Sequence, residues 1–346
     1  MMQTNKYQHC RYRLVFNSPA FLGNASQQAQ WRTPPIKALL RQWWRVAYAA
    51  DKNFIVDVTE MRRAEGLLFG HAWLGDDSFE RNGKQVQTSA RQSTVRIRLD
   101  TADSTTANGW PLGSQAGVAP LPTSLDTSYA WFGLAKRAGL PDRSGIQATP
   151  AKESIRLLRL AVRGDQASQL RIDEVIALIS QFGLLGSRSR GGWGALHIDD
   201  VTPLSPTQIQ RYTRPLDDCL NSDWPMSLAA DQRGPCVWYS KEIFKTWDRA
   251  MRFIATERRH IRTSLKGVNG KDLRRALGFA SAGRMPSPLR WKIIPNGDAL
   301  KVCIFAMPHH IPEDSGQRMS ASDLHAAWRT VCDTLDAMQN LSPRKP

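Results

Sequence analysis

The stretch ESIRLLRLAVRGDQASQLRIDEVIALISQFGLLGSRSRGGWGALHIDDV, residues 153–201, contains half of a recognisable fold. Its first ten residues are rich in aliphatic side chains and predict a strand. Residues 172–182 repeat their apolar side chains at helical spacing, so they predict a helix. A glycine-rich run, residues 186–194, separates that helix from a last short strand, residues 195–201. The stretch therefore predicts strand, helix, turn and strand in succession.

Upstream residues supply the other half of the same unit. Residues 12–16 predict a strand, and Thr33-Pro34-Pro35 is a typical opening for the helix expected over residues 33–50. Residues 93–99 alternate with period two and predict a further strand. The complete order is strand, helix, strand, strand, helix, strand. That order indicates an α+β fold of the ferredoxin-like type, in which helices cover one face of an antiparallel sheet. RNA-recognition modules share this topology.

The chain divides into two expected domains joined by a linker. Residues 1–201 form the first, with a Thr-, Ser-, Gly- and Pro-rich insertion at about residues 101–150. Residues 202–223 are expected to be the linker. In residues 224–346 a helix over 241–262, two strands around a turn at 295–298 and a closing helix over 322–338 predict a partial, second ferredoxin-like (RRM-like) unit.

Charge is the most informative feature of the composition. The 346 residues include 47 Lys and Arg against 31 Asp and Glu, which gives a net charge of +16. Residues 241–292 alone contain fourteen basic and four acidic residues. Such an excess favours a polyanionic partner, because bound phosphates release counterions and association is steered electrostatically. The asymmetry indicates a nucleic-acid groove in the second domain.

The five cysteines are scattered and form no CxxC pair, so neither a zinc site nor a disulfide framework is expected. No apolar signal region precedes Cys10, and no run of about 20 apolar residues could span a membrane. We therefore expect a soluble, cytoplasmic protein with reduced thiols, without a cofactor or metal and without a membrane partner.

The first helix has a basic, aromatic face opposite its apolar one. At about 100° per residue, Lys37, Arg41, Trp44, Arg45 and Tyr48 lie together. Exposed large aromatics need a cover. Stacked RNA bases with phosphates on the cations, a partner subunit or the insertion could each provide it.

The run Gly186-Ser-Arg188-Ser-Arg190-Gly191-Gly192-Trp-Gly194 is a second candidate site. Glycines permit close approach of the backbone, so amide N–H groups can point at a phosphate beside the two arginines. The run is neither a Walker A loop nor a dinucleotide fingerprint. A tight turn with two exposed arginines is the alternative.

Three further segments carry a family resemblance. PAFLG (residues 19–23), WRTPPIKALLRQWWR (31–45) and EGLLFG (65–70) resemble the start of the first RAMP subunit of the Cmr complex, the type III-B CRISPR effector. The glycine-rich run is similar to the motif that all members of the RAMP superfamily share. RMPSPL (284–289) resembles a motif in the C-terminal half of that subunit. Residues 101–150 and 202–223 depart from the pattern, so a variant type III complex stays open.

The resemblance implies two ferredoxin-like domains and a place at one end of the ribonucleoprotein. There the subunit would contact the 3′ region of the guide RNA, the paired target RNA and neighbouring RAMP subunits in antiviral defence. Since base pairing reads the target, phosphate and shape contacts should dominate. The residues expected to bind RNA or a subunit are Arg32, Lys37, Arg41, Trp44, Arg45, Tyr48, Gly186, Arg188, Arg190, Gly191, Gly192, Gly194, Arg258, Arg259, Arg284, Arg290 and Lys292.

We expect no catalytic activity, because neither a nuclease His-Asp pair nor a Gly-Gly-Asp-Asp signature is present. The pairs Asp76-Asp77 and Asp199-Asp200 are expected to be solvated, and His309-His310 to be structural or exposed. The alternative is a guide-RNA-processing endoribonuclease of the RAMP superfamily, with general acid–base chemistry at His71 or His260.

Overall fold

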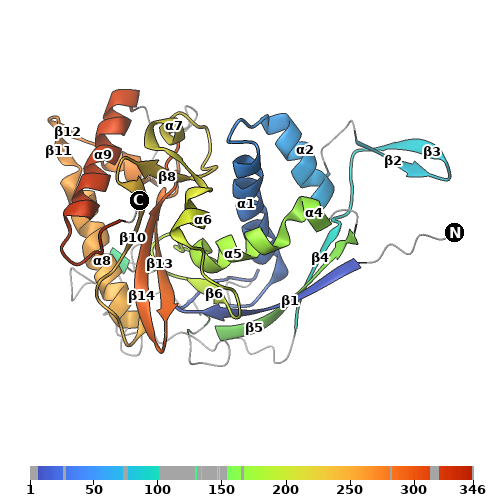
Figure 1. Cartoon of the computed structure of the whole chain (residues 1–346), viewed down its shortest axis with the longest axis horizontal. Coiled ribbons are helices and arrows are strands. Elements are labelled where there is room, and N and C mark those ends of the chain that lie inside the picture. The colour runs from blue at the N-terminus through green and yellow to red at the C-terminus, as the bar shows by residue number, and fades with distance from the viewer. Residues whose placement is uncertain are drawn as a thin grey trace.

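A computed structural model describes residues 7–25, 29–72, 77–100, 129–130, 134, 146, 148, 154–164, 167–280, 283–311 and 319–344. The N-terminal half contains β1 (Tyr7–Phe16), α1 (Thr33–Asp51), α2 (Val58–Phe69), β2 (Asp77–Arg81), β3 (Lys84–Thr88), β4 (Val95–Leu99), β5 (Ile155–Arg163), α4 (Ala167–Leu170), α5 (Ile172–Phe182) and β6 (Leu196–Ile198). The main sheet has the order β4-β5-β1-β6, and its pairs are antiparallel. Helices α1 and α5 lie on one face of it (Figure 1).

The C-terminal half contains α6 (Pro206–Gln210), β7 (Thr213–Pro215), α7 (Leu216–Leu220), β8 (Leu228–Asp231), β9 (Gly234–Pro235), β10 (Val237–Tyr239), α8 (Trp247–Ser264), β11 (Lys266–Val268), β12 (Lys271–Asp272), the 3₁₀ helix η3 (Arg274–Leu277), β13 (Leu289–Asn296), β14 (Ala299–Ala306) and α9 (Ala321–Ala337). Its central sheet has the order β10-β14-β13. Helices α8 and α9 cover one side of that sheet (Figure 1).

Two hydrophobic cores interlock between the halves. The first joins the main sheet to α1 and α5, and it also receives Phe305 from β14. The second lies between β13, β14, α8 and α9, and it receives Trp193 from the glycine-rich run. Phe182 at the end of α5 contacts Phe305 with ring centroids 5.0 Å apart. The glycine-rich run is therefore held where the two cores meet.

The mixed α+β class, the antiparallel sheets and the N-terminal element order are confirmed. The second ferredoxin-like unit and the domain boundaries stay predictions. Residues 202–223 are more than a linker, since α6, β7 and α7 form there and Leu216 and Leu220 are buried. Most of the insertion at 101–150 lies outside the described residues. Within the described ranges, no helix has the length and apolarity needed to cross a bilayer.

The sequence-based prediction missed the hairpin of β2 and β3, which pair only with each other in the described sheets. It extends away from the main sheet in Figure 1. The signal was present, because Asn82-Gly83 between two short strands is typical of a tight hairpin turn, and both residues have positive φ.

Candidate functional site

The glycine-rich loop, residues 186–194, lies along the edge of β13. Trp291 N–H donates to the Arg190 carbonyl over 3.1 Å, and Gly191 forms a parallel bridge with Trp291. Trp193 is fully buried, and its Nε1–H donates to the Ala130 carbonyl over 2.9 Å. The loop thus covers an exposed sheet edge, which sheets otherwise leave open to non-native pairing.

Helix α8 packs directly on this loop. A Cβ built on Gly191 would lie 2.5 Å from Arg258 Nη1, and one on Gly192 would lie 2.7 Å from Ile254 Cδ1. Gly192 also has a φ of +100°, which side-chain-bearing residues rarely adopt. Glycine is therefore required at position 192 for the approach of the helix, whereas at Gly191 the nearest atoms belong to the end of the Arg258 side chain. The loop and α8 were predicted as separate sites, and the structure brings them together.

Three arginines gather where the loop meets α8. Burial lowers the pKa of Arg258, and the nearby charges of Arg188 and Arg262 lower it further, while Tyr129 acts the other way. The Arg258 guanidinium lies 5.0 Å from the centroid of the Tyr129 ring, a cation–π geometry. Among the described groups that act on Arg258, none is a carboxylate. The cluster places cations beside an aromatic ring.

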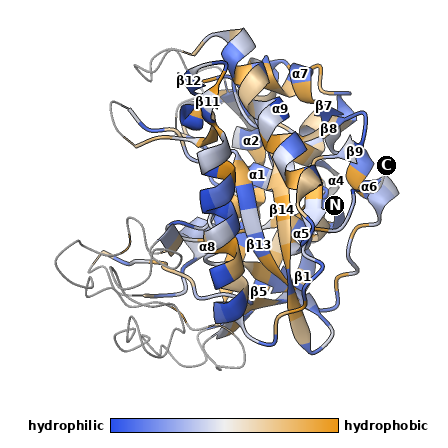
Figure 2. Ribbon diagram, turned by 90° about the vertical axis from the view of Figure 1, so that its left-hand side faces the viewer, coloured by the Kyte–Doolittle hydropathy of each residue, from blue (hydrophilic) through white to orange (hydrophobic). Residues whose placement is uncertain are grey.

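The surface continues along the exposed side of α8 and the turn before it. Lys245, Arg249 and Arg252 are exposed, and Arg262 is half-buried. In the part of the chain that the structure describes, none of the four forms an ion pair. Figure 2 shows the hydrophilic residues of α8 on this outer side, with the apolar strands β13 and β14 behind it. We call Lys245, Arg249, Arg252, Arg258 and Arg262 with Arg188 the α8 surface.

Of the two acids of α8, Asp248 and Glu257, neither forms an ion pair with this surface among the described residues. Glu257 is buried, and it accepts a hydrogen bond from Asn340 Nδ2 over 2.7 Å. His260 Nδ1 lies 3.6 Å from the other Glu257 oxygen. Glu257 therefore holds the segment that follows α9 through this hydrogen bond. His260, offered above as an acid–base candidate, is exposed and has no catalytic partner besides this carboxylate among the described residues.

Four N–H groups of the amide cradle expected in the glycine-rich loop are already used. Those of Ser187, Gly191, Gly192 and Gly194 donate to backbone carbonyls within the chain. Gly186 and Gly194 allow close packing of the loop on its neighbours, because Cβ atoms there would lie 2.9 Å from Phe21 O and 1.8 Å from Leu185 O. Arg188 is exposed, whereas Arg190 is half-buried and its Nη1–H donates to the Ser287 carbonyl over 2.9 Å.

The prediction that α1 exposes a basic, aromatic face is wrong. Arg41 and Arg45 both converge on Glu65 of α2, whose side chain is only 3% exposed. Arg41 Nε lies 2.6 Å from one Glu65 oxygen, and Arg45 donates to both oxygens over 2.8–2.9 Å. Trp44 is 1% exposed and donates from Nε1 to the Gln169 carbonyl over 2.8 Å. Helices α2 and α4 supply the cover that RNA bases, a partner subunit or the insertion was expected to supply.

The remaining predicted residues of α1 follow the same pattern. Tyr48 is half-buried with its ring 5.1 Å from that of Trp44, and Lys37 is half-buried with its pKa lowered by burial and then by Arg41. Arg32, the residue before the helix, is half-buried, and its Nε has no hydrogen-bond partner. These residues lie away from the α8 surface in the sequence and in the fold.

The predicted cations of β13 are buried. Lys292 has no exposed surface, and its Nζ donates to the carbonyls of Ile179 and Ser180 at the end of α5 over 3.2 and 2.6 Å. Burial lowers its pKa to about 7. Arg290 is 3% exposed. Lys292 therefore joins the two halves and cannot reach RNA, while Arg284 and Arg259 are exposed.

His71 is structural in this fold. Its side chain is fully buried, and its Nε2 lies 2.7 Å from Asp77 Oδ2. Asp77 also accepts from Arg91 over 2.6 and 2.7 Å. Burial opposes ionisation of Asp77, yet the hydrogen bonds from Arg91 and His71 lower its pKa. The network anchors the β2–β3 hairpin. The expectation of a solvated Asp77 is therefore wrong, and Asp76 lies outside the described residues.

Asp199 is also paired, with Arg13 at 3.1 Å and His197 Nε2 at 3.0 Å, whereas Asp200 is exposed. His309 is buried, as one of the two expectations had it.

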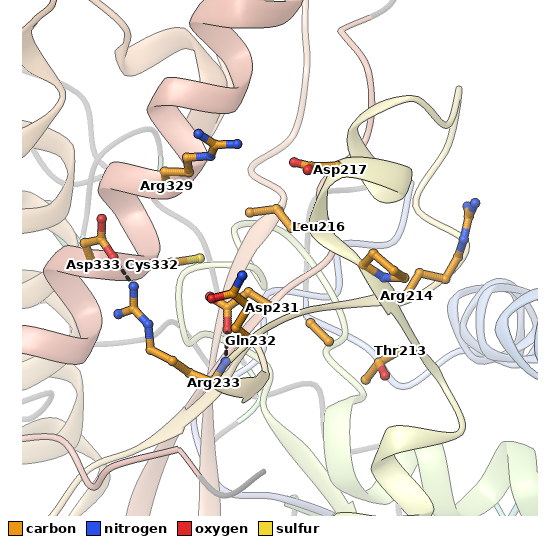
Figure 3. A pocket seen from close by; sticks show the side chains of 12 residues that line it. Thr213, Arg214, Leu216, Asp217, Asp231, Gln232, Arg233, Arg329, Cys332 and Asp333 are labelled. Carbon is orange, nitrogen blue, oxygen red and sulfur yellow. Dashed lines mark hydrogen bonds and ion pairs between the residues drawn. The ribbon is translucent and has the colours of Figure 1, made fainter.

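A cleft of about 680 Å³ lies elsewhere, between β7, β8 and α9 (Figure 3). Its lining alternates basic and acidic side chains, including Arg214, Arg329, Asp217 and the Arg233–Asp333 ion pair. Cys332, Cys236 and Asp231 form a possible metal-ligand trio at its edge. The guanidinium of Arg344 already fills that place, 2.8 Å from Asp231 Oδ2 and 3.5 Å from Cys236 Sγ. The trio is therefore neutralised within the chain.

The predicted site residues did not include Tyr129 or four members of the α8 surface, which are Lys245, Arg249, Arg252 and Arg262. Arg252, Arg259 and Arg262 recur at helical spacing within α8, so the helical period could have placed them on one side. Tyr129 offered no such signal, because its contact with Arg258 depends on the path of a long insertion.

No family model and no curated protein matches this chain. Among the solved structures similar to it are the following two. One is Cmr1 from Pyrococcus furiosus, with 17% identity, coverage of 95% of this chain and 97% of that one, and a TM-score of 0.48. The other is a chain of the type III-B Cmr-beta complex bound to cognate target RNA, with 10% identity, coverage of 94% and 100%, and a TM-score of 0.48. Both belong to the Cmr group that the sequence motifs predicted. At these TM-scores the likeness carries no argument about function.

Proposed function

We propose that this chain is a non-catalytic RNA-binding subunit of a type III CRISPR ribonucleoprotein. In this proposal the α8 surface holds the sugar–phosphate backbone of guide and target RNA, in the 3′ region of the guide, beside neighbouring RAMP subunits. The three-stranded sheet with α8 and α9 would be the second, partial ferredoxin-like unit. Reduced cysteines fit the cytoplasm, which stays a prediction.

One observation supports this function above the others. The glycine-rich loop and the basic helix, which are far apart in the sequence, meet at Gly191 and Arg258. They form a cationic surface on which Lys245, Arg249, Arg252 and Arg262 have no ion pair among the described residues, and Tyr129 provides an aromatic ring beside Arg258. Cations for the phosphates and an aromatic side chain for a base are the two components that bind single-stranded nucleic acid.

The guide-processing endoribonuclease is the second candidate, and the histidines argue against it. An acid or base must come within hydrogen-bond reach of the reacting hydroxyl. His71 is fully buried in an ion-pair network, and His260 has only a distant contact with a buried glutamate. Incubation of the purified chain with repeat RNA tests the point. Cleavage at a single site that is lost in His71→Ala would replace the binding proposal with the enzyme.

Salt dependence of RNA binding tests the α8 surface. The logarithm of the affinity for single strands falls with the logarithm of salt with a slope of about −0.7 per neutralised phosphate. The double variant Arg252→Gln/Arg262→Gln should lower the magnitude of that slope by roughly 1.4. Lys84→Gln/Arg329→Gln removes the same charge from the β2–β3 hairpin and α9, at exposed residues without a described ion pair, and is the matched control. Equal slopes for both variants would refute the assignment of RNA to α8.

A further inference from the structure

Two arginines are placed side by side where the glycine-rich loop meets β13. Arg190 and Arg290 each precede one member of the Gly191–Trp291 parallel bridge, and Trp291 N–H donates to the Arg190 carbonyl. Residues at equivalent positions of paired strands share a face. Successive residues of a strand point to opposite faces. Because Trp291 lies in the second core, Arg290 points to the other face of β13, which it shares with Lys292.

The two side chains form few hydrogen bonds for groups that are buried to this extent. Arg290 is 3% exposed, and its Nε is buried without a hydrogen-bond partner. Arg190 is half-buried and has one printed contact of its side chain, from Nη1 to the Ser287 carbonyl. Neither forms an ion pair or a stacking contact with an aromatic ring in the described ranges. Other buried arginines of the chain, such as Arg344, are paired with carboxylates.

A histidine lies near enough to the pair for their charges to act on it. His309 follows β14 and is 8% exposed, and its Nδ1 lies 2.7 Å from the His310 carbonyl. When Nδ1 carries the only proton of the ring, Nε2 is an acceptor, so the neutral ring adds no donor for an anion. Burial lowers the pKa of His309, and the charges of Arg190, Arg290 and His310 lower it further. No carboxylate of the described residues is among the groups that act on any of the three.

Buried guanidinium groups are costly unless an anion compensates them. Two planar guanidinium forks match a tetrahedral oxyanion, because each can donate to two of its oxygens. We propose that Arg190 and Arg290 form a binding site for one phosphate group at the junction of the two cores. The site is separate from the α8 surface, and it does not depend on the proposed function.

The phosphate could be a group of an RNA strand or a free phosphate ion, and the test separates these sources. The full chain is melted in low-millimolar inorganic phosphate at constant ionic strength, with chloride as the reference anion. A bound anion should raise the Tm of the native chain saturably, by roughly 2–4 °C. Arg290→Gln should abolish the rise. Arg284→Gln removes the same charge from an exposed residue and should keep it.

If Arg290→Gln does not fold, Arg190→Gln provides a second variant, because a half-buried side chain tolerates replacement better than a buried one. An equal rise in the native chain and both variants, or no rise at all, would overturn the site. Glu313 and Asp314 lie outside the described residues, so Glu313→Gln/Asp314→Asn is a further arm. If the double variant alone responds to phosphate, these carboxylates neutralise the arginines and the proposal fails.

Competition identifies the source of the phosphate. When an RNA phosphate occupies the site, inorganic phosphate should weaken binding of an unstructured RNA to the native chain, and Arg290→Gln should remove this competition. When the site takes free phosphate, RNA affinity should be the same with and without it, while the Tm response persists. A Tm response without any RNA binding would leave the phosphate site standing and refute the proposed function.

Discussion

Replacing Glu65 by Gln should destabilise the fold without weakening RNA binding. The Glu65 carboxylate is 3% exposed and holds two arginines through hydrogen bonds of 2.6–2.9 Å. Loss of one partner of a buried ion pair costs about 3–5 kcal/mol. The Arg41 and Arg45 side chains keep 34% and 38% of their exposure, so water compensates part of the loss. We therefore expect Glu65→Gln to lower the free energy of unfolding by ~3 kcal/mol.

The reverse change gives a sharper result. Arg41→Gln/Arg45→Gln leaves the Glu65 carboxylate buried without a cation, which should cost ~3 kcal/mol or more. Adding Glu65→Gln to that variant should restore ~2 kcal/mol, because the uncompensated charge is removed. Urea-induced unfolding measures all three variants, and RNA affinity is measured alongside. If the triple variant is no more stable than the double, or if RNA affinity falls while stability is unchanged, the ion-pair interpretation of this helix is wrong.

Three further predictions concern other parts of the chain. Burial lowers the pKa of Lys292 to about 7. Between pH 7 and 9 the unfolded chain therefore binds more protons than the folded chain, and the free energy of unfolding rises with pH. In unfolding experiments at several pH values, Lys292→Met should remove up to about 1.4 kcal/mol per pH unit of that slope. Gly194→Ala should lower the free energy of unfolding by several kcal/mol (roughly 3 or more), because its Cβ would lie 1.8 Å from a backbone oxygen. Gly191→Ala should fold and lose RNA affinity, because the nearest atoms to its Cβ belong to the end of the Arg258 side chain. Calorimetry and RNA titration of both variants check this. His71→Ala should lower Tm by several degrees, since Asp77 loses a buried partner, and an unchanged Tm would contradict the anchoring role of His71.

The secondary structure was predictable where one side of an element sets its pattern. Helix α5 begins and ends at the predicted residues, because its apolar spacing matches the single sheet that it covers. Helix α1 was predicted correctly as a helix but wrongly in its exposure. It packs on the sheet with one side and on α2 and α4 with another, so Trp44 is buried although it lies opposite the apolar stripe. Helical periodicity identifies the first neighbour of a helix and gives no sign of the second.

Strand β13 illustrates the same limit in a sheet. Its sequence LRWKII alternates apolar and basic residues, which is typical of a strand with one solvated face. Both faces are covered instead, and the glycine-rich loop lies along its edge. The charge count placed the basic excess correctly in residues 241–292. It could not separate Arg290 and Lys292, which are buried, from the arginines of α8, which lie at the surface.

Arginine serves three physical roles in this chain, and the position of the nearest carboxylate distinguishes them. Beside the buried Glu65, Arg41 and Arg45 stabilise the contact of two helices. On α8 the buried acid Glu257 accepts from Asn340, and Asp248 in the first turn forms no ion pair among the described residues, so the positive field there reaches solvent. At Arg290 the guanidinium is buried and no described carboxylate acts on it, so an anion from outside the chain can neutralise it. Composition assigns the same charge of +1 to each of these arginines. Among them, only Arg41 and Arg45 have their charge compensated by a described carboxylate of the chain, so they alone need no ligand.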